Sequence, residues 1–190
     1  MKKIETFTLP ETRFLSNFYP YKNKQGEKYP EKVSVTYEGI EFDCTENAYQ
    51  AAKSLNIELR KEISRMNPFQ SKKYWIGKEE QIRPDWEEIK ISVMRELIFQ
   101  KFTNNPQLKQ MLLDTEDALL EEGNTWEDTY WGICNGIGEN NLGKILMEIR
   151  DSLKHIKQRR FSNIRTTHDR HYGFTHNFLY SFYSQISFTS

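Results

Sequence analysis

Histidine is absent from the first 154 residues of this 190-residue chain. Its four histidines, His155, His168, His171 and His176, all lie in the last fifth. A Ser-His-Asp triad, a histidine-ligated metal or a histidine general base would therefore need the end of the chain to fold back into the site. If residues 1–153 form a catalytic domain, its proton chemistry must come from carboxylates, lysine or tyrosine.

Cysteine is also scarce, because only Cys44 and Cys134 occur, far apart and in no CxxC spacing. This argues against a disulfide framework and against a cysteine metal site. The longest apolar runs are too short for a spanning helix, and no apolar segment follows the two N-terminal lysines. We therefore expect neither secretion nor membrane insertion, and we predict a cytoplasmic protein.

The chain has no excess charge, with 27 Lys and Arg residues against 27 Asp and Glu residues. Any contact with nucleic acid or another polyanion must therefore be local. From about Lys154 the composition becomes basic, then aromatic and serine-rich, with almost no acid. The length and this change predict one domain over residues 1–153 and an appended tail over residues 154–190. The sequence leaves open whether the tail is disordered, grips nucleic acid or contacts a partner.

The first part of the chain has the pattern of strands. Residues 3–9 alternate apolar and polar positions, and residues 33–44 do so twice around Glu38 and Gly39, which is typical of a two-residue hairpin. A further short strand is predicted near residues 118–122.

Helical patterns dominate the rest of the body. The first helix has Thr45 as its N-cap, and Pro84 begins the longest one. Residues 69–79 are interpreted as a basic, aromatic connector, and residues 123–143 as a shaped binding loop rich in glycine and asparagine. The remaining predicted helices cover residues 57–65, 106–115 and 144–153.

Three polar side chains recur on the first predicted helix. Glu46, Gln50 and Lys53 are four and then three residues apart, so they fall on one stripe of a helix with about 3.6 residues per turn. The alanines of the same helix lie opposite and can pack on the core. The stripe faces either water or a cleft, and periodicity alone leaves both interpretations open.

Further polar groups stand beside aromatic residues and glycines in the clusters RPDW, EDTYWG and ENNLGK. Each cluster has a plain structural interpretation, in which Asp85 charges a helix start and Asp128 caps a turn. Asn141 and Gly143 would then only open the last helix. Their combination with the segment RFLSNFYP favours a binding site.

Five blocks of the sequence, taken in order, resemble the NADAR superfamily and in particular its YbiA-like N-glycosidases. The likeness runs from Arg13 to Leu153, and the blocks are FLSNFYP, YEGIEFDCTENAYQAAK, RPDWEEIKISVMRELIFQKF, LLDTEDALLEE and YWGICNGIGENNLGKILMEIR. The resemblance implies an α+β fold, a mostly helical single domain with a small β-sheet. It also implies hydrolysis of an N-glycosidic bond between ribose C1 and an exocyclic amine, without a metal or redox cofactor.

Two substrate classes are associated with this family: phosphorylated ribosylaminopyrimidine intermediates of riboflavin biosynthesis, and ADP-ribose attached to guanine. The chain departs from the family at one central position, where Asn47 replaces the histidine that the family commonly has. This leaves Glu46 as the acid-base candidate. The segment after Leu153 matches nothing in the family.

Cleavage of an N-glycoside requires stabilisation of positive charge at C1 and delivery of a proton to the departing amine. We predict that Glu46 is the general acid/base, while Asp85 or Asp128 holds the ribose or the second charge. In an alternative route, Lys53 attacks C1 of a ring-opened ribosylamine and forms an imine, if its pKa is lowered. These four side chains are the predicted catalytic residues.

The other predicted site residues bind substrate. Trp86 and Trp131 offer faces for stacking the base. Arg13, with Lys53 or Lys144, offers charge for phosphate, and the backbone amides that open the last helix are expected to cradle it. The predicted substrate-binding residues are Arg13, Ser16, Asn17, Phe18, Gln50, Trp86, Trp131, Gly132, Asn141, Gly143 and Lys144.

Three functions compete. The leading hypothesis is a damage-control hydrolase that acts on a small phosphorylated ribosylamine, with no membrane association and no obligate protein partner. The alternative removes ADP-ribose from guanine in nucleic acid or nucleotides, and the basic tail then holds the strand. The third is a module that binds ADP-ribose without cleaving it, which would have no need for the acid-base groups.

Overall fold

The computed structural model of the protein describes residues 2–166, with side chains through residue 156. It divides into two units, residues 1–154 and 155–190. The last helix, α6 (Asn141–Thr166), begins in the first unit and continues into the second. The segment predicted as a tail is therefore helical as far as Thr166, and the rest of that prediction lies outside the described residues.

The described strands form three separate two-stranded sheets rather than one small sheet. The two parallel pairs are β1 (Lys3–Ile4) with β4 (Leu119–Leu120), and β5 (Gly123–Asn124) with β6 (Ile133–Cys134).

The predicted hairpin is present as β2 (Val35–Tyr37) and β3 (Ile40–Phe42), which pair antiparallel. Its turn residues, Glu38 and Gly39, have φ angles of 44° and 80°. Two consecutive left-handed residues are what a tight hairpin turn requires, so the sequence signal was correct.

Helices make up most of the regular structure, and the predicted α+β class is confirmed. Asn56, Asn67 and Asn105 each cap a helix by accepting a hydrogen bond from a backbone N–H of its first turn. The helices before α6 are α1 (Thr45–Ala52), α2 (Ile57–Ser64), α3 (Pro68–Lys73), α4 (Trp86–Thr103) and α5 (Pro106–Leu113), with the short 3-10 helices η1 (Arg13–Leu15) and η2 (Glu79–Gln81).

The start of α1 differs from the prediction, because Thr45 is its first helical residue and Cys44 stands at the N-cap position. The Asn17 carbonyl accepts hydrogen bonds from the Cys44 thiol and from the Glu46 N–H, at 3.1 and 3.0 Å. Every residue of α1 is buried, so a backbone carbonyl from another segment replaces the side-chain cap of an exposed helix. This contact fixes Glu46 beside Asn17.

A helix also forms where the sequence suggested only a connector, because α3 takes up the first part of residues 69–79. The Asn67 side chain accepts from the Phe69 N–H, and the Gln70 side chain accepts from the Asn67 N–H. This reciprocal pair is a capping box, with Pro68 at the first helical position. α3 packs against α1 and so carries its lysines to the same side of the molecule.

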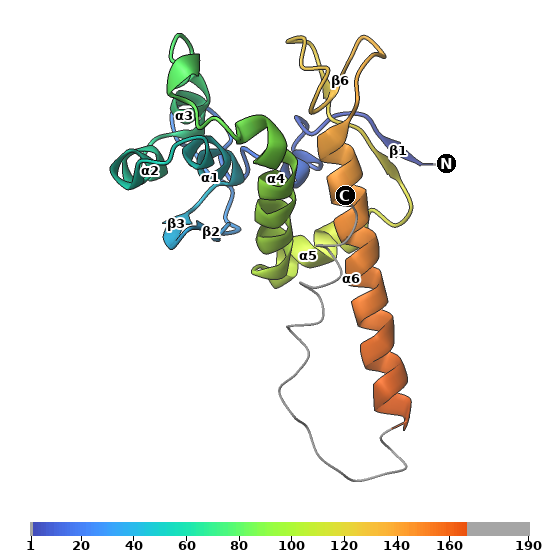
Figure 1. Cartoon of the computed structure of the whole chain (residues 1–190). Coiled ribbons are helices and arrows are strands. Elements are labelled where there is room, and N and C mark those ends of the chain that lie inside the picture. The colour runs from blue at the N-terminus through green and yellow to red at the C-terminus, as the bar shows by residue number, and fades with distance from the viewer. Residues whose placement is uncertain (1, 167–190) are drawn as a thin grey trace. The chain divides into compact units, whose positions relative to one another are not determined.

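α4 lies at the centre of the first unit, where it packs against α1 on one side, and its Arg95 pairs with Glu148 of α6 on the other (Figure 1). Its Lys101 is only 1% exposed and donates a hydrogen bond to the Ser16 carbonyl at 2.8 Å. α4 therefore anchors the segment that follows η1. None of the described helices has the length and apolarity needed to cross a membrane.

Candidate active site

A cavity of about 350 Å³ lies where the segment after η1, three helices and the stretch around β5 meet. We call it the cleft. Carboxylates, amines and aromatic rings share this one space. Its lining residues are Asn17, Phe18, Glu46, Tyr49, Gln50, Lys53, Lys72, Trp86, Glu87, Lys90, Met94, Glu122, Asp128, Tyr130 and Trp131.

α1 supplies the polar stripe predicted from its spacing. Glu46, Gln50 and Lys53 all line the cleft, so the stripe does not face bulk water. Glu46 is 5% exposed, and its Oε1 atom accepts a hydrogen bond from the Gln50 amide at 2.8 Å. The four-residue spacing on the helix brings these two groups together.

Burial changes the proton affinity of the carboxyl groups in the cleft. It raises the pKa of Glu46, against the attraction of Lys72 and the hydrogen bond from Gln50. Burial, with repulsion from Asp128, also raises the pKa of Glu122 to about 8. Both glutamates therefore hold protons at a higher pH than exposed carboxyl groups do, as a general acid requires near neutral pH.

Two lysines of the cleft form no ion pair with a carboxylate among the described residues. The ion pairs of the described residues include neither Lys53 nor Lys72, whereas Lys90 pairs with Glu87. Burial lowers the pKa of Lys53, against the attraction of Glu46. Lys53 therefore has the lowered proton affinity that a nucleophilic amine requires.

Aromatic rings form one wall of the cleft. The Tyr49 ring centre lies 4.9 Å from that of Trp86 and 5.5 Å from that of Trp131. Tyr130 meets Trp131 edge-on, with 5.1 Å between ring centres. The Lys53 Nζ atom lies 5.8 Å from the ring centres of both Tyr49 and Trp86. Because Trp86 is buried and Trp131 only half-buried, Trp131 is the more accessible ring for a flat ligand.

Two amides of the cleft carry a buried acceptor without a partner among the described residues, namely Asn17 Oδ1 and Gln50 Oε1. Their nitrogens are occupied, because Asn17 Nδ2 donates to the Met94 sulfur at 3.3 Å and Gln50 Nε2 donates to Glu46. Unsatisfied carbonyl oxygens in a cavity are suited to accept hydrogen bonds from hydroxyl or amino groups of a ligand.

Asp128 both caps a turn and lines the cleft. Its Oδ1 atom accepts a hydrogen bond from the Trp131 N–H at 2.8 Å, and its own N–H donates to the Asn124 side chain. Asp128 therefore caps a turn, as the structural interpretation predicted, but its carboxylate also lines the cleft and is available to a ligand.

Within the described residues no group of three or more His, Cys, Asp or Glu side chains is arranged to hold a metal ion.

Asp85, Ser16 and Lys144 do not line the cleft. Asp85 forms an ion pair with Arg83 at the start of α4, as a charged helix start would. Ser16 is 4% exposed, and its hydroxyl accepts from a backbone N–H of its own segment. Lys144 is exposed on α6. The choice between the two predicted aspartates therefore falls on Asp128.

Asn141, Gly132 and Gly143 position the walls of the cleft without lining it. Backbone N–H groups of residues 140–142 donate to carbonyl groups of residues 130–132. The protein's own backbone therefore occupies three of the donors that were predicted to cradle a phosphate at this helix start. A Cβ atom on either glycine would lie 2.2 Å from a backbone carbonyl oxygen, so both positions require glycine for close packing.

Asn47, which replaces the family's usual histidine, also lies outside the cleft. Its side chain donates to the Met66 carbonyl at 2.6 Å and accepts from the Ser71 hydroxyl at 2.8 Å. It therefore ties α1 to the chain around α2 and α3.

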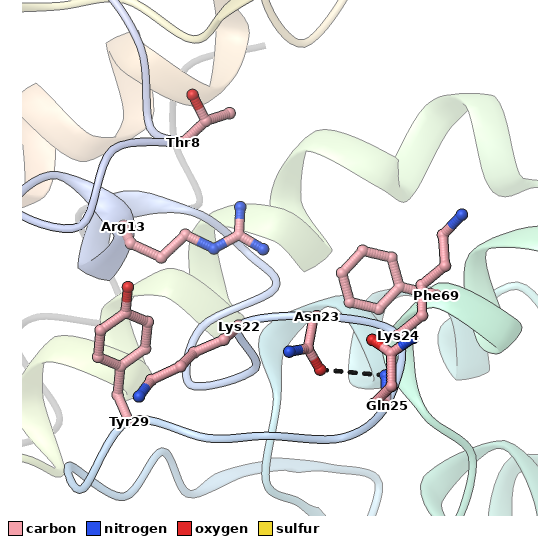
Figure 2. A pocket seen from close by; sticks show the side chains of 8 residues that line it. All are labelled: Thr8, Arg13, Lys22, Asn23, Lys24, Gln25, Tyr29 and Phe69. Carbon is pink, nitrogen blue, oxygen red and sulfur yellow. Dashed lines mark hydrogen bonds between the residues drawn. The ribbon is translucent and has the colours of Figure 1, made fainter.

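Arg13 lines a second cavity, of about 390 Å³, which we call the Arg13 cavity (Figure 2). Eight of the fifteen predicted site residues share the cleft. Those that line the cleft are Asn17, Phe18, Glu46, Gln50, Lys53, Trp86, Asp128 and Trp131.

Several residues of the cleft were missed by sequence reasoning. Tyr49 could have been found, because it lies three residues after Glu46 on the same helix. Lys72 becomes predictable once α3 is recognised as a helix. Glu122 has no such local signal, because the strands around it are only two residues long. The missed residues are Tyr49, Lys72, Glu87, Lys90, Met94, Glu122 and Tyr130.

Comparison with known proteins matches residues 6–154 to the NADAR domain. N-glycosidase YbiA of Shigella boydii is 35% identical over 144 residues, which cover 72% of this chain and 87% of that protein. Riboflavin biosynthesis protein VVA0006 of Vibrio vulnificus is 33% identical over 144 residues, which cover 74% of this chain and 35% of that protein. The NMR structure of the E. coli protein YbiA is similar with a TM-score of 0.68 at 27% identity, covering 92% of each chain.

Proposed function

The chain belongs to the NADAR domain family, and we propose that it is an N-glycosidase that hydrolyses the bond between ribose C1 and an exocyclic amine. The proposed substrate is a phosphorylated ribosylaminopyrimidine, an intermediate of riboflavin biosynthesis. The observation that carries the proposal is the buried Glu46 carboxyl, which shares a cleft with lysines and aromatic rings. The names of two relatives, an N-glycosidase and a riboflavin biosynthesis protein, support the bond and the substrate class.

Glu46 is the proposed general acid/base. Because burial raises its pKa, its protonated form persists to a higher pH than that of an exposed carboxyl group, and it donates a proton to the departing nitrogen as the C1–N bond breaks. The resulting carboxylate then takes a proton from the water molecule whose oxygen bonds to C1. The sum is hydrolysis, in which ribose 5-phosphate gains a hydroxyl, the pyrimidine leaves as an amine and Glu46 is protonated again.

The positive charge that develops at C1 requires a carboxylate nearby. We assign this role to Asp128, which lines the cleft and is held by the Trp131 N–H. Glu122 complements it, because a carboxyl group with a pKa of about 8 is protonated at neutral pH and can donate a hydrogen bond to the sugar.

Lys53 offers a second route to the same products. Its amine would attack C1 of the ring-opened ribosylamine, expel the pyrimidine amine and leave the sugar on Lys53 as an imine, which water then hydrolyses. The lowered pKa of Lys53 and the lack of a carboxylate partner among the described residues suit this step. Borohydride reduces such an imine to a stable amine, so the two routes can be told apart.

The rest of the substrate also finds matching groups in the cleft. The half-buried Trp131 ring is suited to stack on the pyrimidine. Lys72 and Lys90 offer positive charge for the 5′-phosphate. The unsatisfied oxygens of Asn17 and Gln50 are suited to accept hydrogen bonds from the ribose hydroxyls.

A second candidate is hydrolysis of ADP-ribose from guanine, in nucleotides or in nucleic acid. It breaks the same type of bond with the same groups. The observation that favours it is the Arg13 cavity, which offers further cations for a second phosphate. The tail that would hold a nucleic-acid strand in this alternative lies largely outside the described residues.

A mass-spectrometric time course tests the proposal, with ribosylaminopyrimidinone 5′-phosphate and an ADP-ribosylated guanine oligonucleotide offered side by side. We expect ribose 5-phosphate from the first substrate. Release of ADP-ribose alone would replace the proposal by the second candidate, and no product from either would overturn both. In samples reduced with borohydride, a sugar retained on Lys53 would support the imine route, and its absence would support Glu46 acting without it.

A further inference from the structure

Two side-chain oxygens of the cleft are buried without a hydrogen-bond donor. Asn17 is 7% exposed and Gln50 is 4% exposed, and both line the cleft. Neither Asn17 Oδ1 nor Gln50 Oε1 accepts a hydrogen bond from the described residues. A buried acceptor that stays unpaired is costly, so the donor that completes each of these amides comes from whatever occupies the cleft.

Contacts with the protein fix which end of each amide is left free. Asn17 Nδ2 donates to the Met94 sulfur at 3.3 Å, and Gln50 Nε2 donates to Glu46 Oε1 at 2.8 Å. An amide that turned over would bring its oxygen against the Met94 sulfur or the Glu46 carboxylate, both of which are acceptors. The cleft therefore presents two fixed oxygens, and it selects ligand groups that donate a proton.

Both acceptors adjoin the carboxyl group of Glu46. The Asn17 backbone carbonyl accepts hydrogen bonds from the Glu46 N–H at 3.0 Å and from the Cys44 thiol at 3.1 Å, which holds Asn17 at the start of α1. Gln50 lies one helical turn after Glu46 and contacts its carboxyl group directly. One acceptor is thus joined to the backbone of Glu46 and the other to its side chain.

The position of Glu46 indicates which donor of the substrate these oxygens meet. In the proposed reaction Glu46 protonates the nitrogen on ribose C1, and the sugar hydroxyl nearest to that bond is the 2′-hydroxyl, on the adjacent carbon. A hydrogen bond to this hydroxyl strengthens as positive charge develops at C1, so it favours the transition state over the bound substrate. A hydrogen atom at the same place would leave the buried oxygens unpaired.

We propose that Asn17 and Gln50 recognise the 2′-hydroxyl group of the sugar, which makes the protein specific for ribosylamines over 2′-deoxyribosylamines. Met94 is a positioning residue, because its sulfur holds the Asn17 amide with the oxygen free. Discrimination of this kind is strong when a site is built to pair with a hydroxyl that the competing ligand lacks. The inference rests on the proposed function for the placing of C1 beside Glu46.

Isothermal titration calorimetry with ribose 5-phosphate and 2-deoxyribose 5-phosphate tests this specificity. The unchanged protein should bind the deoxy sugar roughly 10-fold or more weakly. Asn17→Leu keeps the approximate size of the side chain and removes the acceptor. It should weaken ribose 5-phosphate to the level of the deoxy sugar and leave the deoxy sugar unchanged, because the two changes remove the same hydrogen bond. Gln50→Met should reduce the same ratio of affinities.

Two further variants separate recognition from folding. Met94→Leu conserves volume and removes the sulfur, so the Asn17 amide is free to turn and the ratio should fall by a smaller factor. Thr45→Val is the matched control. Thr45 is fully buried, and its hydroxyl oxygen also lacks a partner among the described residues, but it does not line the cleft. Its replacement should leave the ratio of affinities unchanged.

Two results would overturn the inference. They are equal affinities of the unchanged protein for the two sugars, and a ratio of affinities that persists in both Asn17→Leu and Gln50→Met. The proposed function fails separately. If no glycoside is hydrolysed while these variants abolish the preference for ribose 5-phosphate, the glycosidase proposal is wrong and the recognition of the 2′-hydroxyl stands. If the glycoside is hydrolysed and the preference is absent, the reverse holds.

Discussion

Residues of one short segment line both cavities, but the two cavities are lined by different kinds of side chains. Arg13 points into one cavity, and Asn17 and Phe18, a few residues later, line the other. The cleft encloses acids, amines and rings together, whereas the Arg13 cavity gathers cations without acids. Bond cleavage requires groups whose proton affinities are shifted, and recognition of an anion requires only charge and donors. We therefore expect bond cleavage in the cleft, and at most recognition of an anion in the Arg13 cavity.

The largest expected effect belongs to the acid of the cleft. Glu46→Gln keeps the size of the side chain and an oxygen that can accept from Gln50, so the fold should persist. Loss of the proton donor should lower kcat by about 10²- to 10⁴-fold with little change in the affinity for ribose 5-phosphate. Steady-state kinetics and calorimetry on the same preparation measure both quantities.

Glu87→Gln is the matched control, because Glu87 also lines the cleft but is exposed and paired with Lys90. Its activity should fall by less than about 10-fold, as expected for a screened surface carboxylate. Equal losses in Glu46→Gln and Glu87→Gln would mean that the cleft acts through its total negative charge, and the assignment of Glu46 as the acid would be abandoned.

A smaller effect is expected at the aromatic wall. Trp131→Ala removes a half-buried ring that contacts Tyr49 and Tyr130, and it should raise KM by roughly 10-fold through lost stacking on the base. The free energy of unfolding should fall by only about 1–2 kcal/mol, because the ring is partly exposed. Urea unfolding and kinetics of the same variant compare the two losses.

Trp126→Ala provides the control for this ring, because Trp126 is 51% exposed and does not line the cleft. It should leave stability nearly unchanged and raise KM much less than Trp131→Ala does, because its ring meets the cleft only through Lys72, whose Nζ atom lies 5.8 Å from the ring centre. If Trp131→Ala lost stability with an unchanged KM, Trp131 would be a packing residue and not part of the binding surface.

The sequence predicts those cleft residues that recur at the spacing of a helix. Glu46, Gln50 and Lys53 share a stripe because a helix repeats at a fixed angle, and this spacing is visible without a structure. Glu122 also lines the cleft, and its carbonyl oxygen packs so closely on Gly132 that a Cβ there would lie 2.2 Å from it, a long-range contact that no local pattern reports. The resemblance brought Trp86, Asp128 and Trp131 into the same prediction, but only the structure separates Asp85 from them.

The Arg13 cavity could not be recognised from the sequence for a related reason. Arg13 stands in the motif that supplies Asn17 and Phe18, so proximity in sequence suggested one common site. The 3-10 turn of η1 ends at Leu15, and the chain then turns so that Arg13 and Asn17 serve different cavities. A side chain's direction at such a turn depends on tertiary packing, which composition and periodicity do not contain.

The smallest effect is expected from the replacement of Lys101, whose side chain supports the segment that lines both cavities. This lysine is fully buried and donates to the Ser16 carbonyl, and burial lowers its pKa from the ordinary value of 10.5 to about 7. Between these two pH values the unfolded chain binds more protons than the folded protein, so stability should rise with pH from about 7 toward 10.5. Lys101→Met should remove this rise, which is at most about 1.4 kcal/mol per pH unit, while the exposed-site variant Lys144→Met keeps it.

Urea unfolding at pH 6.5, 7.5 and 8.5 measures how the free energy of unfolding changes with pH. The comparison between variants requires that their m-values in urea are the same. Because Lys101 lines neither cavity, its loss should weaken the binding of ribose 5-phosphate only slightly. An unchanged pH slope in Lys101→Met would show that the buried amine is not the titrating group. If Lys101→Met weakened the binding of only one ligand, either ribose 5-phosphate in the cleft or an anion in the Arg13 cavity, the segment around Ser16 would not support the two cavities equally. The assignment of chemistry to one cavity and recognition to the other would then have to be revised.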